Sequence, residues 1–198
     1  MIKAIMFDLD GVLVNACDWH YHSLNDALEK YKGFKISYND HLDKYNGLPT
    51  SVKLDMLNIL GKDRENIWRM KQDRTLENIK TYGRVDRYKT KMLKKLKQEE
   101  YKLVCVTNSI RETAIEMLKS TGQLEMFDFI VTNEDVQNNK PSPDCYLLAM
   151  SKLGLTKNEC LIVEDSTKGK LAAYASGAKV LEVEDIYDVT LDNLRRML

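Results

Sequence analysis

Five short runs of apolar, largely β-branched residues place the main constraint on how this 198-residue chain can fold. Runs of this length and composition are typical of buried parallel strands. They are Ile2–Phe7, Leu103–Val106, Phe129–Thr132, Leu161–Val163 and Lys179–Leu181. Segments with apolar residues at helical spacing separate the last four runs. This alternation predicts an α/β fold, a Rossmann-like parallel sheet flanked by helices.

The segment between the first two runs does not follow this alternation. A crossover between parallel strands needs only about a dozen residues, but here residues 15–82 intervene, with little strand character. Three helices are expected there: a stripe over Leu24–Tyr31, a helix N-capped by Thr50 that carries Leu54, Leu57 and Ile59, and a long helix through Ile67, Met70 and Ile79. We therefore expect an α/β core domain of residues 1–14 and 83–198, with an inserted helical cap domain of residues 15–82. A helix over Val85–Leu96 should return the chain to the sheet.

Composition and charge narrow the class of protein. The chain has 30 basic residues (Lys and Arg together) and 30 acidic residues (Asp and Glu together). No overall electrostatic field therefore attracts nucleic acid or a membrane surface. The basic segment Lys89–Lys97 carries apolar residues at helical spacing, which favours a solvated helix face over a binding patch. The four cysteines form no CxxC pair and there is no apolar stretch near 20 residues and no signal pattern. We expect a reduced, cytoplasmic protein.

Two aspartates follow the first apolar run. Side chains alternate along a strand, so Asp10 returns to the side of Asp8, and Gly11 then permits a sharp turn. Two carboxylates at one strand end repel each other unless a cation lies between them, and Mg²⁺ is the natural candidate. Taken alone, the pair is more often a solvated strand end.

Three later motifs favour a functional site over a solvated strand end. Val106–Ser109 follows the second run, Asn139–Pro143 lies between two strand–helix units, and Val163–Ser166 ends the fourth run with two more acids. Alone, the first would be read as a helix N-cap and the second as a loop. Four polar motifs in register at strand ends are far more specific than any one of them.

Together these motifs resemble those of the haloacid dehalogenase-like hydrolases, over nearly the whole chain. The likeness is to β-phosphoglucomutase-like and phosphoglycolate phosphatase-like members with a helical cap. The resemblance implies that Asp8 is a nucleophile that forms an aspartyl-phosphate, and that Asp10 is the general acid and then the base. It implies that the Thr107 hydroxyl and neighbouring backbone N–H groups, at Asn108, bind phosphoryl oxygens, and that Lys140 stabilises the transferred charge.

The resemblance also implies a Mg²⁺ cofactor. It assigns Asp165 as a direct ligand and Glu164 as a direct or water-mediated one. The Asp8 carboxylate and the Asp10 backbone carbonyl complete the protein ligands.

Within the expected cap, two residues are candidate substrate contacts. His20 stands where the mutases carry a histidine, and Lys71 aligns with a lysine that meets the distal substrate phosphate. A hinge residue and a solvated lysine are the alternatives.

The cap also departs from the mutase pattern. Asn46 stands in place of a lysine and Thr50 in place of an arginine that clamps a second phosphate. A neutral threonine cannot do so, which favours a phosphatase, although Lys44 and Lys53 could substitute.

The sequence thus predicts a Mg²⁺-dependent phosphatase of a small phosphomonoester metabolite, such as a sugar phosphate. The alternatives are a sugar-phosphate mutase and, from another class, a catalytically quiet binding or regulatory module. The expected partner is a small phosphorylated metabolite, without nucleic acid or membrane, and the expected state is a monomer.

Overall fold

The computed structural model describes residues 1–198, and the chain divides into two compact units. The first unit comprises Met1–Asn15 and Arg84–Leu198, and the second comprises Ala16–Gly83. The chain therefore leaves the first unit once and returns to it. The domain boundaries expected from the sequence fall one residue from these.

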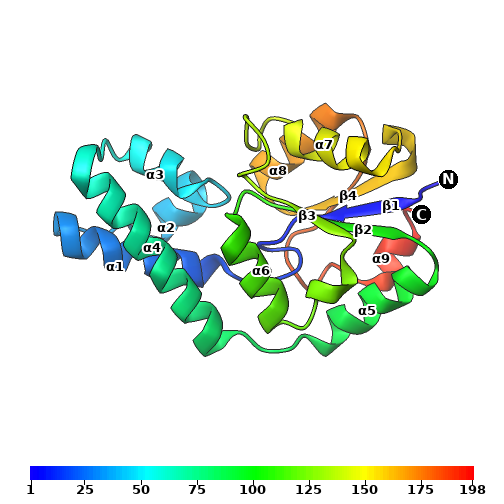
Figure 1. Ribbon diagram of the computed structural model, residues 1–198, viewed down its shortest axis with the longest axis horizontal. Helices are drawn as coiled ribbons and strands as arrows, with labels where there is room; N and C mark the ends of the chain where they lie inside the picture. The colour runs from blue at the N-terminus through cyan, green and yellow to red at the C-terminus, as the bar shows by residue number, and fades with distance from the viewer. The chain divides into compact units, whose positions relative to one another are not determined.

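A five-stranded parallel sheet forms the centre of the first unit (Figure 1). The strand order is β3-β2-β1-β4-β5, with Phe7 of β1 beside Cys105 of β2 on one side and Val163 of β4 on the other. All five predicted strands are confirmed, and so is the α/β Rossmann-like fold. The strands are β1 (Ala4–Phe7), β2 (Lys102–Val106), β3 (Phe129–Val131), β4 (Cys160–Glu164) and β5 (Lys179–Glu182).

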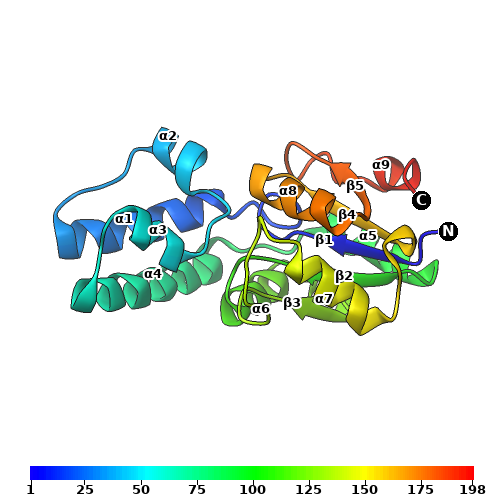
Figure 2. The same cartoon turned by 90° about the horizontal axis from the view of Figure 1, so that it is seen from above.

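Helices cover both faces of this sheet (Figures 1 and 2). One face carries α7 (Asp144–Leu153) and α8 (Thr167–Ser176), and the other carries α5 (Arg87–Gln98), α6 (Arg111–Ser120) and α9 (Leu191–Arg195). Short 3₁₀ turns, Leu124–Met126 and Lys157–Glu159, precede β3 and β4. Under α7 and α8 the core is fully buried and includes Met6, Val104, Val106, Tyr146, Ile162 and Ala173.

The second unit is helical, and α1 packs along α4 (Figure 2). Its apolar core contains Leu24, Leu28, Leu54 and Ile67. The three predicted helices are present. The elements are α1 (Cys17–Lys32), α2 (Tyr38–Asp40), a π-helical turn (His41–Tyr45), α3 (Thr50–Met56) and α4 (Gly61–Tyr82).

Two helix starts differ from the sequence prediction. Pro49, with extended backbone, occupies the N-cap of α3, and Thr50 is the first helical residue. The Thr50 hydroxyl instead accepts a hydrogen bond from Gln72 Nε2 at 3.3 Å, so a contact between helices has taken the place of a local cap. Helix α5 begins at Arg87 because the Asp86 side chain caps it by accepting from Lys89 N.

The helix α3 is also shorter than expected, since it ends at Met56 and leaves Ile59 beyond it. Among all the helices, none combines the length and the apolar character needed to cross a membrane.

Candidate active site

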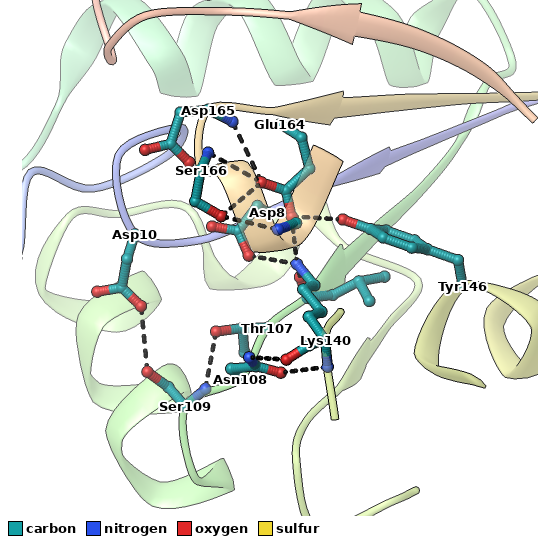
Figure 3. Close-up of polar contacts among 12 residues, drawn as sticks. Asp8, Asp10, Thr107, Asn108, Ser109, Lys140, Tyr146, Glu164, Asp165 and Ser166 are labelled. Carbon is teal, nitrogen blue, oxygen red and sulfur yellow. Dashed lines mark hydrogen bonds and ion pairs between the residues drawn. The ribbon is translucent and has the colours of Figure 1, made fainter. Parts of the chain in front are cut away.

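The two acidic motifs meet at the carboxyl ends of the adjacent strands β1 and β4 (Figure 3). Asp8 directly follows β1, and its N–H donates to the Val163 carbonyl at 3.0 Å. Glu164 ends β4, and Asp165 comes next. The strand order reverses between β1 and β4, and this reversal is where open α/β sheets bind ligands.

Lys140 joins the two motifs. Its Nζ lies 2.6 Å from Asp8 Oδ1 and 2.6 Å from Glu164 Oε1, and it donates to the Val106 carbonyl at 2.8 Å. Burial acts to lower the pKa of Lys140, but the charges of Asp8 and Glu164 hold it well above its usual range. The site therefore contains a charged ammonium group, only 4% exposed, shared between two carboxylates.

The carboxyl groups of Asp8 and Asp165 lie in an environment that disfavours their ionised forms. Burial raises the pKa of Asp8 well above its usual value, and the Glu164 charge adds to this while Lys140 opposes it. Burial also raises the pKa of Asp165 to about 7, again with a contribution from Glu164. A single lysine does not balance this group of acids, so ionisation of both Asp8 and Asp165 calls for a further cation.

The residues present fit a hard divalent cation. Ligand oxygens of Asp8, Glu164 and Asp165 all lie within 4.8 Å of one another. Asp165 Oδ1 is buried and has no hydrogen-bond partner, as a ligand oxygen awaiting a cation would be. Glu164 differs, because Oε1 accepts from Lys140 and from the Tyr146 hydroxyl, while Oε2 accepts from the N–H of Asp165 at 3.1 Å.

The carboxyl group of Asp10 lies apart from this cluster and faces the loop after β2 (Figure 3). Its Oδ2 accepts from the Ser109 hydroxyl at 3.1 Å. The Ser109 N–H donates to Thr107 Oγ1 at 3.0 Å, so the Thr107 hydroxyl closes a turn within the loop. It does not cap α6, whose N-cap is Ile110.

Asn108 connects the second and third motifs. Its Nδ2 donates to the Lys140 carbonyl at 3.3 Å, and the Lys140 N–H donates back to Asn108 Oδ1 at 3.1 Å. The side chain therefore fixes the backbone of Lys140. Its contact with a phosphoryl group stays a prediction.

Two glycines allow the acidic side chains to pack closely. A Cβ on Gly11, which has φ of +86°, would lie 2.1 Å from Asp165 Oδ2. A Cβ on Gly169 would lie 2.0 Å from Glu164 Oε1. Neither position can carry a side chain without displacing an acid of the site.

The site residues predicted from the sequence do not include Gly169, Tyr146 and Ser109. A glycine inside a helix is unfavourable by roughly 0.5–1 kcal/mol relative to alanine, and that cost was the available signal at Gly169. Tyr146 lies six residues after Lys140 in the first turn of α7, but nothing in that spacing tells a core tyrosine from one that reaches the site.

In the second unit, the structure brings His20 and Lys71 together. His20 Nδ1 lies 3.1 Å from Lys71 Nζ, and both residues are buried. The ammonium group also lies 3.5 Å from Gln72 Oε1. The proposed contacts of these side chains with substrate stay predictions.

Comparison with known proteins shows which family the chain resembles. The haloacid dehalogenase-like hydrolase family matches residues 5–183. The pyrophosphatase PpaX of Bacillus pumilus is 31% identical over 194 residues, covering 92% of this chain and 83% of the relative. The phosphorylated carbohydrates phosphatase of Thermotoga maritima is 25% identical, covering 95% of this chain and 85% of that one.

Solved structures share the fold at lower identity. The β-phosphoglucomutase of Clostridium difficile superimposes with a TM-score of 0.86 at 20% identity, covering 100% of this chain and 97% of that one. CbbY from Rhodobacter sphaeroides, solved in complex with phosphate, gives 0.84 at 21% identity, covering 94% and 88%. By its match to the family over most of its length, the chain belongs to the haloacid dehalogenase-like hydrolases.

Proposed function

We propose that this hydrolase is a Mg²⁺-dependent phosphatase of a small phosphomonoester metabolite, such as a sugar phosphate, and that it acts through an aspartyl-phosphate on Asp8. The observation that carries the proposal is the position of Lys140 Nζ, 2.6 Å from Asp8 Oδ1. A fixed cation beside the nucleophile offsets the charge that would otherwise repel a phosphate dianion. The phosphatases among the relatives support the same reaction class.

In the first step, an Asp8 carboxylate oxygen attacks phosphorus, and the bond from phosphorus to the ester oxygen breaks. The carboxyl group of Asp10 gives its proton to that departing oxygen, which leaves as an alcohol. The Ser109 hydroxyl, 3.1 Å from Asp10 Oδ2, holds the acid in place. Lys140 stabilises the negative charge shared by Asp8 and the phosphoryl group.

In the second step, Asp10, now a carboxylate, takes a proton from the water that attacks the aspartyl-phosphate. The bond between Asp8 and phosphorus breaks, which releases inorganic phosphate and restores both aspartates. Asp8, Asp165 and the backbone carbonyl of Asp10 would hold the Mg²⁺, which would supply positive charge that offsets the charges of carboxylate and phosphate. The raised pKa of Asp8 and of Asp165 supports this requirement for a cation.

Around these groups, the Thr107 hydroxyl and the backbone N–H groups near Asn108 are proposed to bind the phosphoryl oxygens. His20 and Lys71 are proposed to contact the rest of the substrate. The cytoplasmic location and the monomeric state stay predictions.

The test is phosphate release from a panel of sugar phosphates, phosphoglycolate, nucleoside monophosphates and pyrophosphate, each with Mg²⁺ and with EDTA. Release that needs Mg²⁺ is expected, and the ranking will identify what the enzyme selects. Isomerisation of a glucose 1-phosphate without release would replace the phosphatase by a mutase. If neither phosphate release nor isomerisation is observed, the alternative of a catalytically quiet binding module is favoured.

Substitution of the two aspartates tests their separate roles. Asp8→Asn should abolish phosphate release because the amide is not a nucleophile. Asp10→Asn should lower kcat by ~100- to 10,000-fold, the range of general acid–base catalysis. The exposed Asp192 provides a control, since Asp192→Asn should behave as the wild type. Full turnover by Asp10→Asn would remove Asp10 from the mechanism.

A further inference from the structure

Tyr146 is a fully buried residue whose hydroxyl points toward Glu164 and Lys140 of the candidate active site (Figure 3). The hydroxyl donates to Glu164 Oε1 at 2.7 Å. The Lys140 Nζ lies 4.9 Å from the centre of the Tyr146 ring, within range of a cation–π interaction. One side chain therefore contacts both members of the Lys140–Glu164 ion pair.

The contacts around Glu164 fix the orientation of its carboxylate. Oε1 accepts from Tyr146 and from Lys140, whereas Oε2 accepts from the N–H groups of Asp165 and Ser166 at 3.1 and 3.4 Å. On the side of α8, Gly169 lies so close that an added Cβ would overlap Oε1. Both oxygens are thus committed to protein donors.

This arrangement decides where Lys140 points. Its Nζ donates to Glu164, to Asp8 and to the Val106 carbonyl, so Glu164 and Asp8 compete for one ammonium group. The Tyr146 hydroxyl satisfies part of the hydrogen-bonding capacity of Glu164 Oε1. Without it, Glu164 would draw Lys140 more strongly and weaken the contact with Asp8.

We propose that Tyr146 is a positioning residue of the reaction, which orients Glu164 and, through it, directs Lys140 at Asp8. In this arrangement Glu164 is an anchor for Lys140, and Asp8 and Asp165 would supply the side-chain ligands for the metal. The inference rests on the proposed function, because it assigns Asp8 as the nucleophile.

Tyr146→Phe tests the proposal, since it removes the hydroxyl and keeps the ring. We expect kcat to fall about 10-fold with KM unchanged, as loss of one hydrogen bond to a charged group implies. Tyr174→Phe is the matched control. Tyr174 is 55% exposed and its hydroxyl also donates to a glutamate, Glu182, outside the site, so this variant should retain wild-type kinetics.

Two further measurements separate positioning from packing. In a Glu164→Gln background, Tyr146→Phe should cause no additional loss of kcat, because the two residues act as one unit. Trifluoroberyllate, an anion that mimics a phosphoryl group bonded to a carboxylate, should bind Tyr146→Phe several-fold more weakly in the presence of Mg²⁺. Fluorine NMR measures this affinity without turnover.

The outcomes are distinguishable. Equal kcat and equal trifluoroberyllate affinity for Tyr146→Phe, Tyr174→Phe and wild type would overturn the inference, and so would a lower melting temperature with unchanged kcat. Additive losses of kcat in the double variant would also overturn it. A wild-type protein that releases no phosphate but binds trifluoroberyllate more tightly than Tyr146→Phe would contradict the proposed function and leave the role of Tyr146 supported.

Discussion

At the scale of single residues, the site depends as much on absent side chains as on present ones. Gly169 lies inside α8, where glycine is conformationally costly, and its position is explained by the carboxylate of Glu164 against it. The acid can be fully buried only because no Cβ occupies that space. Gly11 likewise leaves free the space that Asp165 occupies, because a Cβ there would lie 2.1 Å from Asp165 Oδ2.

Gly169→Ala should therefore lower activity despite the better helix propensity of alanine. Displacement of Glu164 would disturb its contacts with Lys140 and Tyr146, and we expect kcat to fall by at least ~10-fold, the equivalent of one charge-assisted hydrogen bond. Phosphate release measures the loss. Thr167→Ala, an exposed substitution in the same helix, should leave kcat unchanged. A Gly169→Ala enzyme with wild-type kcat would show that Glu164 can shift without consequence.

At the scale of elements, the π-helical turn His41–Tyr45 of the second unit holds an unusual histidine. His41 is fully buried, neither ring nitrogen has a hydrogen-bond partner, and the ring lies against those of Tyr21 and Tyr38. Burial lowers the pKa of His41 to about 3, and the nearby charges of Lys53, His20 and Lys71 add to this while Asp18 opposes it. The turn therefore tolerates only a neutral imidazole.

This makes the stability of the protein sensitive to mild acid. The pKa of His41 is about 3 in the folded state and near 6.5 in the unfolded state. The contribution of neutral His41 to stability is therefore fully present above pH 6.5 and is lost as pH falls toward 3. At about pH 5 the loss should be about 2 kcal/mol in the free energy of unfolding. Denaturant unfolding of His41→Phe, which keeps an aromatic ring, should show a shallower pH dependence than the wild type.

The exposed His22 supplies the control, because His22→Phe should keep the wild-type pH dependence. Identical pH profiles for the three would mean that His41 finds a partner for its proton when charged.

The elements also show what the sequence could predict. Buried parallel strands consist of short β-branched runs and their ends carry the acids, so β1 to β5 and the positions of Asp8 and Asp165 at strand ends could be predicted from composition and order. The roles of the two acids rest on the resemblance to the family. The N-cap of α3 could not be predicted, because the Thr50 hydroxyl bonds to Gln72 of another helix. Tyr146 and Gly169 cannot be identified from the sequence for the same reason, because their contacts with Glu164 depend on where α7 and α8 pack on the sheet.

At the scale of the whole molecule, the acidic cluster should couple cation binding to folding. A ligand that binds only the folded state stabilises it, by about 2.7 kcal/mol at 100 times its Kd. Mg²⁺ should therefore raise the melting temperature, and EDTA should reverse the shift. NaCl of equal ionic strength should not reproduce it, and Asp165→Asn should lose most of it. A shift that persists in Asp165→Asn would place the cation elsewhere.

The interruption of the first unit by the second has a consequence for biosynthesis. Ala4 pairs with Lys102 and with Cys160, so β1 leaves the ribosome long before either neighbouring strand exists. The second unit closes its own core from residues within one contiguous segment, and such local contacts form earlier than distant ones. We therefore expect a nascent chain in which the helical insert is already folded while the strand that carries the nucleophile is still unpaired. Catalytic competence should be among the last properties that the growing polypeptide acquires.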